Sequence, residues 1–234
     1  MKSQVLTEHF SRDRALYAGM TDALMRNECD ILYADWDGAL IFDMPGDSYL
    51  ASALTDERAK YLAKLVGDAD FVAVYGARFA DRFRHPARKV KSSWLAAGYL
   101  KTTPVQYRAD FEIRTLTREY LDCVITNYHG NTDRAYIEAR FLSGMIGAFD
   151  GEKLMGFVGT HDNGEIGFLT TLPEYRGHGV AFALESEMTN RYLLQGRLPY
   201  GIIKPDNEIS RALALKVGYT ISDDRVVSFS DDDR

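Results

Sequence analysis

Residues 171–194, TLPEYRGHGVAFALESEMTNRYLL, contain the stretch that decides the fold. Apolar residues lead into Pro173, an arginine and two glycines follow, and a long helical pattern then begins. A chain that enters a helix in this way presents backbone N–H groups without partners inside the helix. Glycines there permit positive φ and a close approach of a ligand, and the helix dipole adds partial positive charge. The segment predicts either a tight turn or an anion site of phosphate or pyrophosphate size.

The composition of the whole chain is that of a globular protein with net negative charge. Its 234 residues are 46% hydrophobic and 26% charged, and the formal net charge is -6. This balance argues against a general binder of nucleic acid or anionic membranes. No run approaches the roughly 20 apolar residues of a membrane-spanning helix, and residues 1–20 lack the apolar core of a signal peptide. We therefore expect a cytoplasmic protein that binds no nucleic acid and no membrane.

The cysteines predict no metal site. Cys29 and Cys123 lie far apart and match no metal-ligand or redox spacing. We expect both to be small core residues in a reduced compartment.

The first half of the chain, residues 1–108, combines helix and strand signals. A helical pattern covers residues 13–27, a hairpin is indicated at Asp37-Gly38, an amphipathic helix covers residues 56–66 and a buried strand follows. From residue 78 to about 108 the sequence is polar, basic and broken by Pro86, which predicts a linker or irregular connection. Its basic cluster, residues 82–91, reads as a solvated surface, with a binding patch as the alternative.

The second half, residues 109–234, predicts an α+β domain. The signals follow the order β-α-α-β-β-β-α-β-α-β-β, and the last two strands come from residues 219–230. Thr117 and Thr132 are the expected N-caps of the first two helices, and Gly144 ends the second. This order predicts a mostly antiparallel mixed sheet with helices on both faces. The first half would be a smaller α/β domain in front of it.

Two motifs carry a resemblance to a known family. LPEYRGHGVAFAL closely resembles the signature of the GCN5-related N-acetyltransferases (GNAT), Arg/Gln-x-x-Gly-x-Gly/Ala, through Arg176, Gly179 and Ala181. NEISRALALKVGY is similar to the family's later helix motif through Asn207, Ser210, Gly218 and Tyr219. The layout resembles glycine-N-acyltransferase-like (FR47-like) members, which pair a degenerate N-terminal half with an active C-terminal half. Residues 1–108 are then either such a degenerate GNAT-like half or a domain of another role.

The resemblance implies acetyl-CoA, and hence coenzyme A, as co-substrate. Its pyrophosphate would be held by the backbone of Arg176, Gly177, His178, Gly179, Val180 and Ala181. The pantetheine arm would pair with the backbone of Leu169, Thr170 and Thr171, and the Leu169 N–H would stabilise the oxyanion. Asn207 and Ser210 would contact the coenzyme arm, although an asparagine before a helix is also an ordinary cap.

The implied reaction is direct acyl transfer to an amine, which requires a general base. Glu165 is the leading candidate, because it stands eleven residues before Arg176, where histone-acetylating members carry a base glutamate. Strand alternation would place Glu165, Gly167, Leu169 and Thr171 on one face. The alternative for Glu165 is an exposed residue beside an Asn-Gly turn. His161 is the second candidate, and a partly buried structural histidine is its alternative.

One departure from the family pattern concerns the general acid. Many members carry a tyrosine seven residues after the motif asparagine, and Ala214 stands there in this chain. Tyr219 is expected to pack in the core, so the proton would come from water or Ser210, or the thiolate would leave unprotonated.

The resemblance thus predicts an N-acetyltransferase that acts on a primary amine of a small molecule or peptide. A non-catalytic CoA-binding sensor or interaction module on the same fold is the alternative. Monomer and homodimer both stay open.

Overall fold

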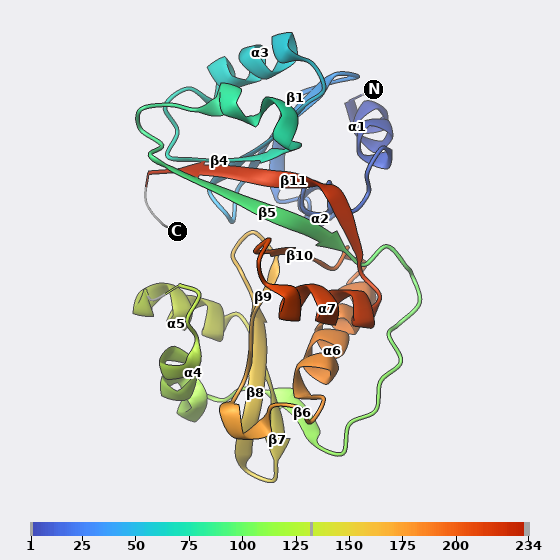
Figure 1. The fold of residues 1–234 in the computed structure, drawn as a ribbon, viewed down its shortest axis with the longest axis vertical. Helices are drawn as coiled ribbons and strands as arrows, with labels where there is room; N and C mark the ends of the chain where they lie inside the picture. The colour runs from blue at the N-terminus through green and yellow to red at the C-terminus, as the bar shows by residue number, and fades with distance from the viewer. Residues whose placement is uncertain (1, 132, 232–234) are drawn as a thin grey trace.

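The protein is described here by a computed structural model that covers residues 2–131 and 133–231. Figure 1 shows an elongated molecule with the first half at one end and α4–α7 at the other. The first elements are α1 (Lys2–Ser11), α2 (Ala18–Arg26), β1 (Cys29–Asp35), β2 (Gly38–Asp43), β3 (Ser48–Ala53), α3 (Asp56–Val66), β4 (Phe71–Tyr75), the 3-10 helix η1 (Ala77–Phe83) and β5 (Val90–Gly98). The later elements are β6 (Glu112–Thr115), η2 (Arg118–Tyr120), α4 (Leu121–Asn127), α5 (Arg134–Leu142), β7 (Ile146–Asp150), β8 (Lys153–Thr160), β9 (Ile166–Thr171), η3 (Pro173–Tyr175), α6 (Val180–Leu194), β10 (Tyr200–Ile203), α7 (Glu208–Val217) and β11 (Thr220–Ser230).

A seven-stranded sheet takes strands from both halves of the chain. Its order is β1-β2-β3-β4-β11-β5-β10. The C-terminal strand β11 runs antiparallel to β4 on one side and to β5 on the other (Figure 1). The pair β3–β4 is parallel, and the other pairs are antiparallel. The division of the chain after residue 108 stays a prediction, and β10 and β11 cross that line to complete the sheet of the first half.

The four-stranded sheet, β6-β7-β8-β9, carries helices on both faces. Figure 1 shows α4 and α5 on one side of it and α6 on the other. The core on the α4–α5 side contains Leu121, Val124, Ile137, Phe141, Phe149, Leu154, Phe157 and Phe168. The core on the α6 side contains Ile146, Ala148, Met155, Val158, Ile166, Val180, Leu184, Met188 and Tyr192. In β8, Leu154 and Phe157 enter the first core and Met155 and Val158 the second, because a register shift opposite Ala148 and Phe149 interrupts the period of two. Each large side chain so buried contributes about 1.5–3 kcal/mol.

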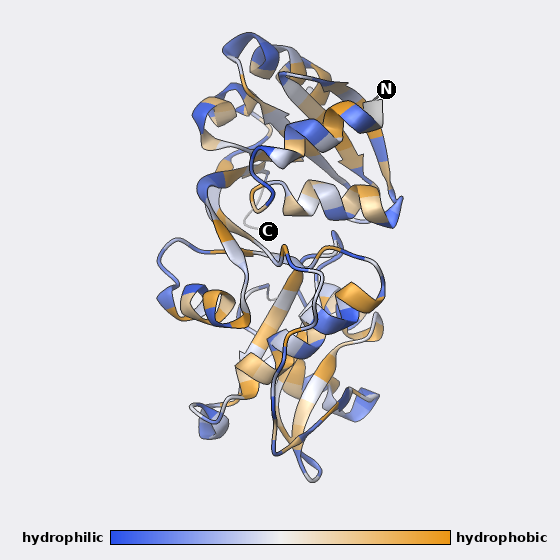
Figure 2. Cartoon of the chain, turned by 90° about the vertical axis from the view of Figure 1, so that its right-hand side faces the viewer, coloured by the Kyte–Doolittle hydropathy of each residue, from blue (hydrophilic) through white to orange (hydrophobic). Residues whose placement is uncertain are grey.

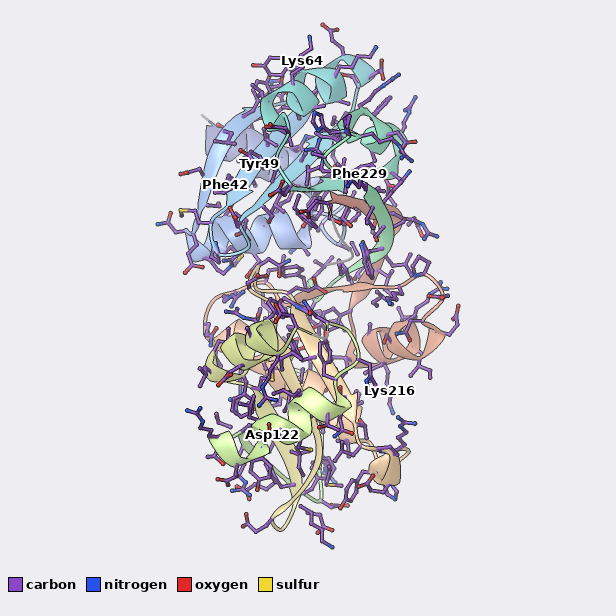
Figure 3. All side chains as sticks on the ribbon, turned by 90° about the vertical axis from the view of Figure 1, so that its left-hand side faces the viewer. Phe42, Tyr49, Lys64, Asp122, Lys216 and Phe229 are labelled. Atoms are coloured by element: carbon purple, nitrogen blue, oxygen red, sulfur yellow. The ribbon has the colours of Figure 1, made fainter. Side chains whose placement is uncertain are left out.

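These observations confirm the α+β fold with a mostly antiparallel sheet and helices on both faces. The predicted hairpin is formed by β1 and β2 around Asp37, and α3 begins with Asp56 and Glu57 in its first turn. Figure 2 shows hydrophobic residues along the strands of the four-stranded sheet, while the helices carry both hydrophobic and hydrophilic residues. Figure 3 shows the side chains, with Phe42 of β2 beside Tyr49 of β3. No helix within the described ranges has both the length and the apolar character needed to cross a membrane.

The prediction of an irregular linker from residue 78 to 108 is wrong for about half of that segment and confirmed for residues 99–108, which form neither helix nor strand. The segment contains η1 and β5, and β5 is an interior strand of the seven-stranded sheet. The sequence of β5, VKSSWLAAG, lacks a clear apolar alternation. Because β11 and β10 pair with its two edges, distant strands supply the stability that its local pattern does not show.

The basic cluster within residues 82–91 is mostly paired. Arg82 bonds to Asp56 at 2.5 Å, and Arg84 and Lys91 both contact Asp81. Arg88 is buried and donates to the carbonyls of Gly67, Ala69 and Phe83 at 3.1, 2.6 and 2.8 Å. The cluster thus contains exposed ion pairs and one buried arginine, which donates to two carbonyl groups after α3 and to one at the end of η1.

The remaining differences lie at element ends. The two short strands expected in residues 219–230 are one strand, β11, with an irregularity between Ile221 and Arg225. Thr117 precedes η2 and makes no side-chain cap. Thr132 lies outside the described residues, and Asp133 caps α5 by accepting from the Ala135 N–H. Helix α1, which the sequence analysis did not predict, packs through Leu6 and Phe10.

Candidate functional site

Strand β9 contains a bulge that re-aims its backbone. Gly159 pairs with Gly167 and Phe157 with Thr170, so one residue of β8 faces two residues of β9. Phe168, one of these two, has φ 58, which is uncommon for a residue with a side chain. Such strain costs on the order of 1–3 kcal/mol and persists where packing holds it. The Phe168 ring is stacked on Tyr128 at 4.2 Å between centroids.

The bulge overturns the expected alternation along β9. Glu165, Gly167, Leu169 and Thr171 were predicted to share one face. In the structure Phe168 joins the core on the α4–α5 side, while Ile166 and Leu169 both pack on the α6 side. Two residues three positions apart therefore share a face, because a bulge adds one residue to the period of two.

Strand β9 also forms the edge of its sheet and lies next to β10 of the other sheet. The two strands approach where β9 begins, since Glu165 Oε1 accepts from the Ile202 N–H at 3.1 Å. A Cβ added to Gly201 would lie 3.3 Å from the Ile166 carbonyl oxygen. Within the described residues β9 pairs only with β8, and β10 only with β5. The backbone of Leu169, Thr170 and Thr171 thus runs along an edge that no described strand covers.

The segment after β9 exposes the start of helix α6. Arg176, Gly177, His178 and Gly179 are all exposed. Gly177 and Gly179 have φ 82 and 79, and no described atom lies within 4 Å of a Cβ built at either position. Gly179 immediately precedes α6, whose first turn contains no acidic residue. The N–H groups of this first turn therefore combine with the helix dipole in an open position, as an anion site requires.

His178 lies within this segment without facing the interior. Its Nδ1 is 3.0 Å from the Arg176 carbonyl oxygen, which accepts from it. Val180 is buried in the core on the α6 side, and Ala181 is half-buried.

The residues present fit the phosphorylated arm of coenzyme A. The glycines leave room for a close approach, and the exposed Arg176 supplies positive charge. The hydroxyl oxygen of Thr171, at the end of β9, is buried and has no hydrogen-bond partner among the described residues. Buried polar atoms are nearly always paired, so this orphaned hydroxyl is suited to a bound polar ligand at the end of the open edge.

Glu165 is buried rather than exposed beside its turn, and its side chain is 8% accessible. Burial raises the pKa of its carboxyl group to about 8, against hydrogen bonds from Ile202 and Asn163 that favour the charged form. Asp162 is the nearby acidic group that adds to the increase in pKa. A carboxyl group with this pKa exchanges its proton near neutral pH, as a general base must.

Three tyrosines that the sequence analysis missed surround this carboxyl group. Burial raises the pKa of Tyr75, Tyr128 and Tyr200, and the charge of Glu165 is a further cause in each case. The pKa of Tyr128 reaches about 12. Tyr75 comes from β4 of the first half, and no local signal in the sequence connects it with residue 165.

His161 lies in an aromatic cluster at the end of β8. Its Nδ1 is 2.8 Å from the Tyr136 hydroxyl, and its ring is 4.9 Å from that of Phe168. A side chain at Gly167 would collide with the imidazole. Burial lowers the pKa of His161 to about 4, so the imidazole is neutral at pH 7. It can accept a proton only weakly, and its catalytic role stays a prediction.

Helix α7 places the second motif. Asn207 caps this helix by accepting from the Ser210 N–H at 3.0 Å. Ala214 is buried where many family members carry a tyrosine. Tyr219 is buried, packs on Tyr99 and lies 2.8 Å from the Thr189 hydroxyl, which confirms its structural role. The coenzyme contacts of Asn207 and Ser210 stay predictions.

The two cysteines are unpaired and half-buried. The described residues contain no cluster of His, Cys, Asp and Glu that could hold a metal ion.

Comparison with known proteins finds similarity in the fold of the chain and in the sequence of its C-terminal region. Residues 144–227 match the sequence profile of the FR47-like protein family. This range extends from β7 into β11 and contains the bulged strand, the glycine segment and Glu165. No curated protein matches the chain in sequence.

Solved structures resemble the chain over most of its length at low sequence identity. A Drosophila protein has a TM-score of 0.59 at 15% identity, with 83% of this chain and 74% of that one covered. A GCN5-related N-acetyltransferase from Kribbella flavida has a TM-score of 0.54 at 10% identity and covers 93% of this chain and 94% of its own. An acetyltransferase of the GNAT family from Colwellia psychrerythraea has a TM-score of 0.53 at 11% identity, with 95% and 96% covered. At such identities the likeness concerns the fold.

Proposed function

We propose, for a chain that has the GNAT fold with an FR47-like C-terminal region, that it is an acyl-CoA-dependent N-acyltransferase. It would move an acetyl group from acetyl-CoA to a primary amine of a small molecule or peptide. The observation that carries the proposal is the bulged edge strand β9, which leads through the short helix η3 into the exposed glycine segment before α6. An open strand edge can bind an extended amide-containing arm, and a free helix N-terminus can bind its phosphates.

The backbone of the site would do most of the binding. The N–H groups of residues 176–181 would hold the pyrophosphate, with Arg176 as the nearby charge. Leu169, Thr170 and Thr171 would hydrogen-bond to the amides of the arm along the open edge of β9. When bound, acetyl-CoA supplies an acetyl group activated as a thioester. Leu169 belongs to the bulge, where the regular ladder is interrupted, and its N–H would stabilise the negative charge on the carbonyl oxygen.

In its ionised form, which becomes more abundant as the pH rises toward the pKa of about 8, Glu165 would accept the proton of the attacking amine, directly or through one water molecule. In this step a bond forms between the amine nitrogen and the acyl carbon, and the carbon–sulfur bond breaks with its electron pair on sulfur. The proton lost by nitrogen resides on Glu165. The sulfur leaves as a thiolate or takes a proton from water or Ser210, because Ala214 has no proton to give.

The proposal is tested first at the glycine segment. Gly179→Glu would place a carboxylate against the pyrophosphate and should weaken acetyl-CoA binding at least 100-fold in isothermal titration calorimetry. Gly196→Glu is the matched control, because Gly196 is also exposed, has φ 69 and lies at the opposite end of the same helix. Both variants add one negative charge and comparable backbone strain, and only the first should lose binding.

Turnover separates the enzyme from the alternative of a CoA-binding sensor. Release of free thiol from acetyl-CoA is followed with a panel of primary amines and with acetylated product as the second readout. Binding together with amine-dependent thiol release supports the enzyme. Binding without turnover on any amine would favour the sensor, and unchanged affinity in Gly179→Glu would overturn both.

A further inference from the structure

The residue proposed as the base comes at the end of a tight turn between β8 and β9. His161 N–H donates to the Glu165 carbonyl at 2.8 Å, and Gly164 N–H donates to the His161 carbonyl at 3.0 Å. The Asn163 side chain accepts from the Glu165 N–H at 3.0 Å. These bonds define the shape of the turn, but they do not attach it to the rest of the molecule.

The backbone of the turn is attached to other elements at two carbonyl groups. The Asn163 carbonyl accepts from Arg26 Nη2 and from the Tyr200 hydroxyl, both at 2.8 Å. The Gly164 carbonyl accepts from the Tyr192 hydroxyl at 2.6 Å and from Arg197 Nη2 at 3.4 Å. Three of these four donors belong to the second half. Arg26 belongs to helix α2 of the first half, 137 positions upstream of Asn163.

Arg26 is held in place by three carboxylates of the first half. Its guanidinium contacts Asp22 at 3.1 Å, Glu28 at 2.7 Å and Asp43 at 2.8 Å. The side chain of Arg26 is 8% accessible, and those of Asp22 and Asp43 are fully buried. The planar guanidinium thus uses all three nitrogens on fixed acceptors, an arrangement that a lysine ammonium cannot reproduce.

Asp22 extends the network back into the second half. It accepts from Arg197 Nη2 at 2.6 Å, from Arg197 Nε at 3.1 Å and from the Leu198 N–H at 3.3 Å. One buried carboxylate therefore joins Arg26, which binds the turn at Asn163, with Arg197, which binds it at Gly164.

A contribution to the stability of the fold does not by itself explain why these charged residues are buried together. Desolvation of buried charges offsets most of their attraction, and well-packed apolar residues often serve the fold as well. The ion pairs also fix the relative positions of the atoms that they join. Through Arg26 and Arg197 they fix the two carbonyl groups that immediately precede Glu165.

We propose that Arg26 is a positioning residue, through which the first half of the chain holds Glu165 at the junction of β9 and β10. The inference rests on the proposed function of Glu165 as general base. Arg26 does not touch the reacting groups, and it acts by fixing the Asn163 carbonyl. The first half would thereby have a defined task in a reaction whose binding segment lies entirely in the second half.

The test uses Arg26→Lys, which keeps the charge between Asp22 and Asp43 but loses the fork of donors. We expect amide hydrogen exchange in residues 161–166 to accelerate at least tenfold, while exchange in β5 and β11 stays unchanged. With the best amine substrate, kcat should fall at least tenfold, with the KM for acetyl-CoA within twofold of the wild type. The apparent pKa of the kcat profile should also move, because Asp162, Tyr75, Tyr128 and Tyr200 would face a displaced carboxyl group.

Two further variants complete the test. Glu28→Gln neutralises the exposed partner of Arg26 but keeps an oxygen that can accept from its Nη1, and should leave exchange and kcat unchanged. Tyr200→Phe deletes one bond to the same Asn163 carbonyl, keeps the ion pairs, and should give a smaller effect in the same direction, which decides the question if Arg26→Lys does not fold. Unchanged exchange in both Arg26→Lys and Tyr200→Phe would overturn the inference. Absence of turnover in the wild type would defeat the proposed function instead, and the exchange measurement would still judge the positioning role.

Discussion

The molecule contains two strand-to-helix junctions of opposite character, β3–α3 and β9–α6. At the first, Thr55 caps the helix by accepting from the Arg58 N–H at 3.2 Å, and Asp56 and Glu57 occupy the first turn. At the second, the 3-10 helix η3 and a turn lead to Gly179, which has no side chain to cap the helix, and the first turn has no acidic residue. The helix N–H groups are satisfied internally at one junction and left available at the other.

The strands that precede the two junctions also differ, in how many of their edges are paired. Strand β3 is paired on both edges, with β2 and β4. Strand β9 is bulged and pairs with β8 alone among the described strands. The residue before β3, Asp47, is exposed, while the residue before β9, Glu165, is buried among tyrosines. At β3–α3 the paired strand and the capped helix contribute to the stability of the fold. At β9–α6 the unpaired strand edge and the uncapped helix N-terminus are suited to binding a ligand.

The largest expected effect concerns Glu165, the buried carboxyl group that precedes β9. Glu165→Gln should lower kcat about 10²–10⁴-fold, the range that general acid–base catalysis supplies. Acetyl-CoA affinity should stay within threefold, because the amide still accepts from the Ile202 N–H. Steady-state thiol release and calorimetry measure the two quantities.

The matched control is Glu185→Gln on α6. Burial also raises the pKa of Glu185, to about 7, and Tyr219 is its hydrogen-bond partner. If a buried carboxyl group of raised pKa were sufficient for catalysis, both variants would lose activity equally. A loss confined to Glu165→Gln would assign the proton transfer to the place where β9 begins beside β10.

The pH dependence of stability gives the next effect. The folded pKa of Glu165, about 8, exceeds the value of about 4.3 for an unfolded glutamate. Between these values the folded state holds a proton that the unfolded state has released. The free energy of unfolding should therefore fall with rising pH, by up to about 1.4 kcal/mol per pH unit from this residue.

Urea titrations at pH 5, 6, 7 and 8 measure this slope. Glu165→Gln should reduce it, and the part contributed by Glu185 should remain. An equal slope in wild type and Glu165→Gln would contradict the burial of this carboxyl group.

The sequence predicts the second junction better than the sheet around it. Glycines, an arginine and a following helical pattern are local signals, so the segment 176–181 and the start of α6 could be identified directly. Strand β5 could not, because its pairing with β10 and β11 connects residues more than 100 positions apart. A local sequence pattern indicates whether a strand is buried, but it does not indicate with which strands it pairs.

The surroundings of Glu165 show the same limit. Its position before Arg176 identified it as a candidate, but Tyr75 and Tyr200, whose pKa its charge raises, come from two other strands. The bulge at Phe168 was also hidden, because its register is set by β8 and its strain is held by the Tyr128 ring. Tertiary contacts therefore overruled the simple alternation along β9.

Arg176 gives a smaller test of the contrast between the junctions. Arg176→Ala should weaken acetyl-CoA binding about tenfold, a cost of about 1.4 kcal/mol, and should reduce the dependence of affinity on salt. Arg84→Ala in the first half removes the same charge from an exposed residue that pairs with Asp81, and should change neither quantity. Equal losses in both variants would mean that only the net charge of the molecule matters.

The smallest effect is expected at the closed junction. Thr55→Ala removes the cap of α3 and should lower the free energy of unfolding by about 1 kcal/mol in urea titrations, while Thr55→Ser keeps the accepting oxygen and most of the stability. Acetyl-CoA affinity should be unchanged in both variants, because the N-terminus of α3 is already satisfied by Thr55 and carries Asp56 and Glu57, which repel phosphates. A change in affinity on loss of this cap would place a ligand at β3–α3 as well and would remove the distinction between the two junctions.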